Sequence, residues 1–471
     1  MRSGNWHGYS RDWTWIPSRG RDLRFTQVLV MAPGLWRPLL DCPKPAAPPQ
    51  VRGTLHVLGS APRSIQRHEP GAGIRNPGEK CKLEISVCNL IAKSTMPYWR
   101  LSAFYLFYFA SLGALIPYWS LYLQSLGFGA AEIGELVAIL MGTKLVAPNV
   151  WGWLADRFGR RMAIIRLASL LSALTFVGVF LGDGFWWLAL VMTVFSFFWN
   201  ASLPQFEATT LTHLGDSTHR YSTIRLWGSI GFILTVAGMG WLLGAYGTGV
   251  LPKVLLLLFL GIWLASLCAP EGESHEQHVE HESLGSVLAR GNVVALLLVC
   301  FLMQASHGPY YTFFSIYLEQ YGYSRSAIGQ LWALGVIAEI GVFLVMHRWL
   351  PRFGPRHLLL VSLFLTTIRW LLLARYPEQL GVMLLAQTLH AASFGVYHAV
   401  AIHLIHVFFT GRHQGRGQAL YSSLSFGAGG AVGSLASGYL WSSTGPQSTY
   451  LWAAVTSGAA LGVTWRYVRP A

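Results

Sequence analysis

Residues 152–161 read GWLADRFGRR, and residues 349–356 read WLPRFGPR. Each stretch follows an apolar run of about 20 residues, the length that an α-helix needs to cross a hydrocarbon core. The shared RFG recurs after about half the length of residues 96–471. A repeat at that distance predicts two related helical bundles in a membrane, with a binding site between them.

The composition also indicates a membrane protein. The chain has 471 residues, of which 53% are hydrophobic and only 11% are charged, whereas an average soluble domain is about 25% charged. The apolar runs leave no polar face for water. We therefore expect an all-α polytopic membrane protein with twelve transmembrane helices in two six-helix halves. The expected spans are roughly 99–123, 132–154, 162–182, 185–209, 222–246, 251–269, 293–318, 326–348, 357–375, 379–407, 417–441 and 446–467.

The pattern divides the chain into four parts. Residues 96–270 are the expected N-terminal six-helix bundle, 271–292 a cytoplasmic linker and 293–471 the C-terminal bundle. Residues 1–95 hold no apolar run long enough to span, and their Lys and Arg outnumber their Asp and Glu by 14 to 6. We interpret them as a disordered extension or as upstream sequence translated from too early a start. The alternative is a basic arm that touches anionic lipid headgroups.

Histidines and cysteines do not predict a metal site or a disulfide framework. The linker holds three histidines, His275, His278 and His281, in a polar stretch that we expect to be solvated. The chain has five cysteines, too few and too scattered for a disulfide framework.

Basic residues in the short loops predict the orientation. With the first span starting inside, the cytoplasmic loops and ends hold fourteen arginines, whereas the other side holds only Lys253, Arg325 and Arg375. Both termini are therefore expected in the cytoplasm of a bacterial cell, with the chain crossing its inner membrane many times.

The stretch 152–161 resembles the G-x-x-x-D-R-x-G-R-R signature of the major facilitator superfamily. The resemblance implies that family's twelve-helix fold and a conformational motif formed by Gly152, Asp156, Arg157, Gly159, Arg160 and Arg161. In the family the aspartate is thought to contact the start of the eleventh helix and stabilise one state of the transport cycle. The alternative is that the cluster only anchors the loop at the membrane face. The second copy lacks the aspartate, so the role is not extended to it.

Three further stretches are similar to the phenylpropionate permease branch of the superfamily, which is related to lactose permease and the nucleoside–proton symporters. They are RLWGSIGF (225–232), QASHGPYYTFFSIYLEQYGYS (304–324) and LWALGVIAEI (331–340). The resemblance implies a secondary active transporter, not an enzyme, that couples uptake of an aromatic carboxylic acid to protons without a cofactor. Its partners would be the substrate, protons and the lipid bilayer, with no nucleic acid, and the chain is expected to be a monomer. A sugar or nucleoside symporter and a non-transporting membrane sensor stay open as alternatives.

Five charged residues fall inside the expected spans: Lys144, Glu207, Arg225, Glu339 and Arg369. Ionisable groups inside a membrane usually face the bundle interior, pair with one another and mark transport pathways. Three cations against two carboxylates leave one positive charge, which a monocarboxylate would neutralise. This charge excess favours an anionic substrate.

Resemblance to lactose permease suggests roles for these charges. Glu207 and Arg225 lie on the helices that hold that relative's sugar-binding Glu and Arg. Glu339, Arg369 and His390 lie on the helices of its substrate and proton site. The relative's proton-carrying glutamate corresponds to Ser393, so another group must carry the proton here.

We expect Glu339 to be that group. Burial raises the pKa of a carboxyl group and a nearby arginine lowers it, so a glutamate under both influences can exchange protons near neutral pH. The alternative is a permanent Glu339–Arg369 pair that only joins two helices. His307 and His390 stay open as proton carriers.

Aromatic and polar residues complete the expected substrate site, which comprises Lys144, Glu207, Arg225, His307 and Tyr311. An aromatic wall with a few polar groups suits a flat ligand, although tyrosines also fill helix interfaces. His403 and His406 are expected near the cytoplasmic interface. The Gly-, Ala- and Ser-rich residues 425–438 are interpreted as a packing surface.

Overall fold

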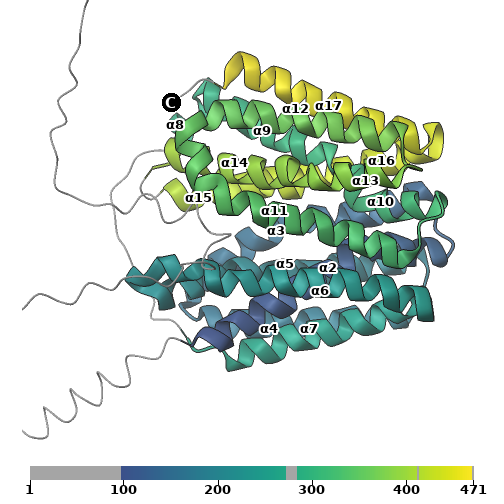
Figure 1. The fold of residues 1–471 in the computed structure, drawn as a ribbon. Helices are drawn as coiled ribbons and strands as arrows, with labels where there is room; N and C mark the ends of the chain where they lie inside the picture. The colour runs from purple at the N-terminus through teal and green to yellow at the C-terminus, as the bar shows by residue number, and fades with distance from the viewer. Residues whose placement is uncertain (1–96, 272–283, 411–412, 469–471) are drawn as a thin grey trace, which may run out of the picture. The chain divides into compact units, whose positions relative to one another are not determined.

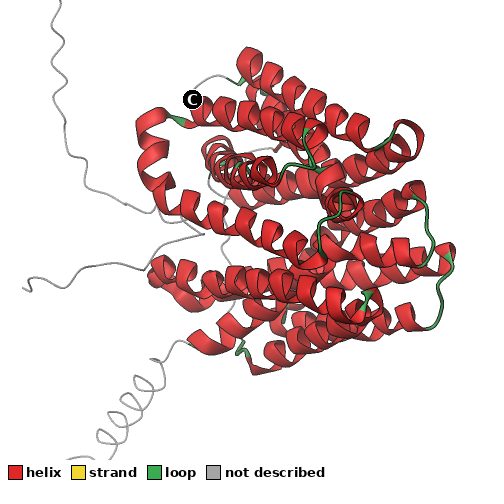
Figure 2. Cartoon of the chain, turned by 45° about the vertical axis from the view of Figure 1, so that its right-hand side comes forward, coloured by secondary structure: helices red, strands yellow, loops and turns green. Residues whose placement is uncertain are grey.

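The computed structural model describes residues 97–271, 284–410 and 413–468 (Figure 1), which all belong to one compact unit. These residues form helices and short connections, and they contain no strand (Figure 2). The expectations for residues 1–95 and for the three linker histidines lie outside the described residues.

The first six expected spans are present as helices, each close to its expected limits. They are α2 (Tyr98–Ser125), α3 (Ala130–Phe158), α4 (Arg161–Phe176) with η1 (Val177–Phe180), α5 (Phe185–Leu214), α6 (Tyr221–Tyr246), and η3 (Thr248–Val250) with α7 (Leu251–Cys268). A short helical turn, η2 (Gly215–Arg220), joins α5 to α6.

The second six spans are also present, after a short helix α8 (Leu284–Leu288). They are α9 (Gly291–Ser306) with α10 (Gly308–Gln320), α11 (Arg325–Phe353), α12 (Pro355–Arg375), α13 (Leu380–Thr388) with η4 (Ala391–Val396) and α14 (Tyr397–Phe408), α15 (His413–Ser422) with η5 (Ser423–Gly429) and α16 (Gly430–Thr444), and α17 (Pro446–Tyr467). Among the described residues, nine helices are long and apolar enough to cross a membrane. The other three expected spans are α3, α15–α16 and α17, which carry more charged, glycine, serine or threonine residues.

Three spans of the second half are not continuous α-helices. The seventh span breaks at His307, because Pro309 in the first turn of α10 has no backbone N–H to continue the ladder. The tenth and eleventh spans each contain a π-helical segment, η4 and η5. Such segments occur frequently at functional sites.

The two halves meet along pairs of helices. α3 packs against α16, α6 against α11, and α2 against α10. A Cβ atom added to Gly134 on α3 would lie 2.6 Å from the Gly438 Cα atom on α16. The backbones of the two halves therefore touch directly here, as the small residues of the eleventh span led us to expect.

Arg325 makes a polar contact between the two halves at the same end of the bundle. We call this contact the Arg325 clasp and this end the Arg325 end. The Arg325 Nε atom is 2.8 Å from the Glu319 carboxylate on α10, within its own half. Its guanidinium also donates a 2.9 Å hydrogen bond to the Leu243 carbonyl on α6, in the other half. Arg325 thereby links the two halves where α6 and α11 meet.

Candidate functional site

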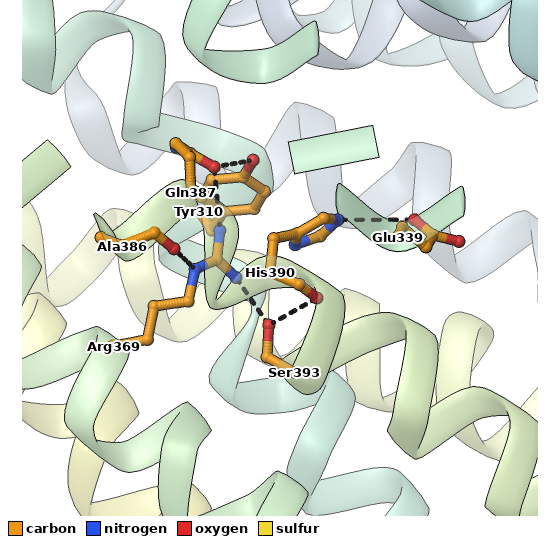
Figure 3. Close-up of polar contacts among 7 residues, drawn as sticks. All are labelled: Tyr310, Glu339, Arg369, Ala386, Gln387, His390 and Ser393. Carbon is orange, nitrogen blue, oxygen red and sulfur yellow. Dashed lines mark hydrogen bonds and ion pairs between the residues drawn. The ribbon is translucent and has the colours of Figure 1, made fainter. Parts of the chain in front are cut away.

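Glu339 lies on α11 and is paired with His390, at the junction of α13 and η4 (Figure 3). The Glu339 Oε2 and His390 Nε2 atoms are 3.8 Å apart, and the two residues are only 8% and 5% exposed. Glycine makes this approach possible, because a Cβ atom added to Gly395 would lie 3.2 Å from the Glu339 Cγ atom. The carboxyl group is therefore held against the tenth span, with a histidine as its partner.

Arg369 on α12 is fully buried, and its partners are neutral (Figure 3). Its nitrogens donate to the Ala386 carbonyl (2.9 Å), the Ser393 hydroxyl (2.9 Å) and the Gln387 side-chain oxygen (3.4 Å). Its guanidinium carbon also lies 4.3 Å and 4.6 Å from the ring centroids of Tyr310 and Trp370. The structure does not bring Arg369 to Glu339. Neutral oxygens and ring faces stabilise the guanidinium instead.

Ser393 has a clear place in this cluster. Its hydroxyl accepts from Arg369 and lies 3.3 Å from the His390 carbonyl, to which it donates. The side chain at the position of the relative's proton-carrying glutamate therefore joins Arg369 to the histidine segment. Tyr310 adds a second connection, because its hydroxyl donates to the same Gln387 oxygen at 3.1 Å and its ring lies 5.6 Å from the His390 ring.

His307 and Tyr311 occupy the break in the seventh span. His307 is fully buried, and its Nδ1 atom lies 2.8 Å from the Met303 carbonyl. Its ring stacks on Tyr311 at 5.7 Å and meets the Trp370 ring edge-on at 4.9 Å. Tyr311 keeps part of its surface exposed, so in this conformation a ligand would reach the tyrosine before the histidine.

The first half contributes a second charged pair. Arg225 Nε on α6 is 3.9 Å from the Glu207 carboxylate on α5, and the guanidinium lies 3.6 Å from the Phe109 ring centroid. The Arg225 side chain is 8% exposed and the Glu207 side chain 34% exposed. α6, which carries Arg225, packs against α11, which carries Glu339. The two predicted groups of charged residues therefore lie on helices that meet across the interface.

Lys144 lies on α3 beside a polar network that sequence analysis missed. Its ammonium group is 3.5 Å from the Met141 sulfur. On the preceding residue, the Thr143 hydroxyl is 2.9 Å from the Ser196 hydroxyl and accepts a 2.9 Å hydrogen bond from Asn200. Ser196 and Asn200 are four residues apart on α5, so they share a helix face. Two polar residues at this spacing inside an apolar span were the signal that could have identified them.

The conformational motif closes the turn between α3 and α4. Gly159 has a φ of 63°, a left-handed conformation that favours glycine. Asp156 is 2.8 Å from Arg161 in its own half, and its side chain is 68% exposed. α3 also packs against α15, the start of the eleventh span, but the described contact of Asp156 is with Arg161. The proposed contact with the eleventh span therefore stays a prediction. Gly152 and Arg157 lie in the last two turns of α3, and Arg160 directly precedes α4.

The described residues contain no group of three His, Cys, Asp or Glu side chains that could hold a metal ion. The spans hold two ion pairs, Glu207–Arg225 and Glu339–His390. They also hold two further cations, Lys144 and Arg369, with aromatic rings packed around Arg225 and Arg369. A fold and site of this kind define a membrane transporter of the major facilitator superfamily.

Residues 98–452 match the MFS_1 like family, and the chain belongs to that family. It is 32% identical to the "Probable 3-phenylpropionic acid transporter" of Escherichia coli (strain K12), over 72% of this chain and 89% of that protein. It is 27% identical to the maltose permease of Geobacillus stearothermophilus, over 72% of this chain and 86% of that protein.

A solved structure shows the same fold. The nucleoside transporter NupG superimposes with a TM-score of 0.67 at 17% sequence identity, over 79% of this chain and 99% of that chain. The family prediction and the fold prediction are confirmed. The chain is a multi-pass membrane transporter rather than an enzyme, and transporters of this family need no cofactor.

Proposed function

We propose that the chain is a proton-coupled symporter that takes up a small aromatic carboxylic acid resembling 3-phenylpropionate. The observation that carries this proposal is the charge balance of the site. In the described part of the chain, Glu207 lies near Arg225 and Glu339 near His390, whereas no carboxylate lies within 4.0 Å of Lys144 or Arg369. A bound carboxylate would balance this excess positive charge, since buried charges need a partner.

Glu339, His390 and Arg369 are the proposed proton-coupling residues. The Glu339 carboxyl group takes up a proton when the site faces outward and releases it when the site faces inward. His390, at 3.8 Å, is the group that senses this change most directly. Arg369 positions His390 through Ser393, which hydrogen-bonds to both residues.

Lys144, Glu207, Arg225, His307 and Tyr311 are the proposed substrate-binding residues. Lys144, Glu207 and Tyr311 retain exposed surface, and Arg225 is held by Glu207 beside the Phe109 ring. His307 is buried and would act by fixing the Tyr311 ring against which the substrate packs. The 32% identity to the E. coli protein supports an aromatic acid as the substrate.

A neutral sugar or a nucleoside is the second candidate substrate. The 27% identity to maltose permease and the fold shared with NupG favour this alternative. A neutral ligand would leave the excess positive charge of the site unbalanced. Competition with labelled 3-phenylpropionate by maltose or uridine separates the two candidates.

The setting of the transporter is part of the same proposal. The chain works as a monomer in a bacterial inner membrane with both termini in the cytoplasm. Its halves, 96–270 and 293–471, move about the site, joined by the linker 271–292. Asp156 and its motif stabilise one of the two states. The excess of arginine in the expected cytoplasmic loops supports this orientation.

The test is a proton-flux measurement on de-energised cells that express the full chain. Sodium 3-phenylpropionate is added to a lightly buffered suspension, and the external pH is recorded. Transient alkalinisation with the wild-type chain, absent from untransformed cells, is expected for symport. Glu339→Gln should abolish it. No alkalinisation with the wild-type chain would refute the proposed function.

A further inference from the structure

A column of three rings runs along the tenth span from the proposed coupling site. The His390 and Phe394 rings stack with their centroids 5.6 Å apart and their planes at 15°. The Phe394 and His398 rings stack at 5.7 Å and 10°. The column begins at the histidine that pairs with Glu339 and ends at a second histidine, on α14.

His398 is held by a buried phenol. Its Nδ1 atom forms a 2.9 Å hydrogen bond with the Tyr421 hydroxyl on α15, and Tyr421 is only 1% exposed. The Tyr421 and Phe426 rings lie 5.9 Å and 6.0 Å from the His398 ring. His398 itself keeps part of its surface exposed. A hydrogen bond at one ring nitrogen fixes the imidazole and assigns proton exchange to the other nitrogen.

Glu339 packs directly beside this histidine segment. A Cβ atom added to Gly395, one turn before His398, would lie 3.2 Å from the Glu339 Cγ atom. The titratable and charged groups around His398 are Glu339 on α11, Tyr421 on α15, His390 on its own span and Arg225 on α6.

A second proton-exchanging group is needed for a physical reason. Glu339 is 8% exposed near the middle of its span, and a bare proton does not cross apolar packing. Chains of acidic and histidine side chains serve as proton relays in pumps and transporters. His398 lies further along the tenth span than His390, toward the expected cytoplasmic end of that span.

We propose that His398 is the proton-release residue of this transporter, an inference that rests on the proposed function. The O–H bond of the Glu339 carboxyl group breaks, and its proton passes through water to form an N–H bond at His398 Nε2. The resulting imidazolium then gives the same proton to water at the cytoplasmic mouth and becomes neutral again. Tyr421 gains and loses nothing, and it is a positioning residue.

The experiment compares two transport modes of the full chain in proteoliposomes with labelled 3-phenylpropionate. Equilibrium exchange swaps substrate across the membrane without releasing the proton, whereas net downhill flux requires release in every cycle. His398→Gln should leave exchange essentially unchanged and slow net flux by about 100-fold or more, as for the loss of a general acid–base group. Imidazole buffer should restore part of the net flux.

Two further variants sharpen the test. Tyr421→Phe keeps the ring and removes the hydroxyl, so it should alter the pH profile of net flux and spare exchange. His403→Gln changes a partly buried histidine of the same helix that lies outside the column, and it should behave as the wild-type chain.

Three results overturn the inference. An equal loss of exchange and net flux in His398→Gln would assign His398 to binding or to folding. Normal net flux in that variant, with coupled transport by the wild-type chain, would refute the release role alone. A wild-type chain that moves neither substrate nor protons would refute the proposed function and this inference with it.

Discussion

Removing the Arg325 clasp should open the Arg325 end of the bundle. In Arg325→Gln the hydrogen bond to the Leu243 carbonyl is lost, and with it a polar link between the halves. A hydrogen bond from a charged donor contributes about 1.5–3 kcal/mol when buried. The Arg325 side chain is 27% exposed, so solvent screening reduces this to about 1–2 kcal/mol. The population with this end open should therefore rise about 5- to 30-fold.

Cysteine labelling measures that population. Val236 is fully buried on α6, where its carbonyl accepts from the Tyr118 hydroxyl. In a chain whose native cysteines are replaced by serine, Val236→Cys should react with a membrane-impermeant maleimide only when α6 and α11 separate. The labelling rate then follows the open population.

A matched control is available at the same end. Arg375 lies at the end of α12 and is exposed. Arg375→Gln therefore removes one positive charge from this end and leaves the Arg325 clasp intact. Labelling should be unchanged in this variant. An equal rise in both variants, or no rise in Arg325→Gln, would show that the clasp does not hold the two halves together.

Three further predictions concern the site and the interface. Gly134→Ala places a Cβ atom 2.6 Å from the Gly438 Cα atom, so it should slow uptake and lower the melting temperature in detergent. Gly142→Ala is the control and should change neither, because the nearest atom to its added Cβ is 3.9 Å away. Arg369→Met removes the hydrogen bonds that the Ala386 carbonyl, the Ser393 hydroxyl and the Gln387 oxygen accept from Arg369, and within the described part of the chain only the Gln387 oxygen keeps another donor, Tyr310. The variant should destabilise the protein by about 2–5 kcal/mol, measured by thermal unfolding. Wild-type stability would contradict the role given to these neutral partners. Lys144→Gln should weaken binding of 3-phenylpropionate but not of its neutral amide, measured by competition; equal weakening of both would exclude a charge contact.

The spans could be predicted because length and polarity alone determine them. The ends expected at 357–375 and 446–467 lie within two residues of Pro355–Arg375 and Pro446–Tyr467. The break at His307 was not predicted, because the seventh span was expected as one helix over 293–318. Proline alone does not signal such a break, since Pro117, Pro148 and Pro204 lie inside continuous helices. Hydropathy does not encode a π turn either, and η4 and η5 went unforeseen.

Side-chain partners were harder to predict than helices. Glu339, Arg369 and His390 were correctly placed on three separate spans, but distance along a sequence does not say which way a buried side chain points. Arg369 lies toward Ser393 and Gln387 because their oxygens satisfy its donors without a second charge. His398 escaped notice because Tyr421, its hydrogen-bond partner on the eleventh span, becomes its neighbour only after the tenth and eleventh spans have packed.

The π-helical segment beside the site has a geometric consequence. A π turn holds one residue more than an α turn, and each residue of an α-helix turns the chain by about 100°. Deleting one residue from η4 would restore an uninterrupted helix and rotate α13, with His390 at its end, by that angle relative to α14. The span would keep almost all of its length and hydrophobicity. The register of one helix, rather than the chemistry of its side chains, therefore decides whether Glu339 has a histidine beside it.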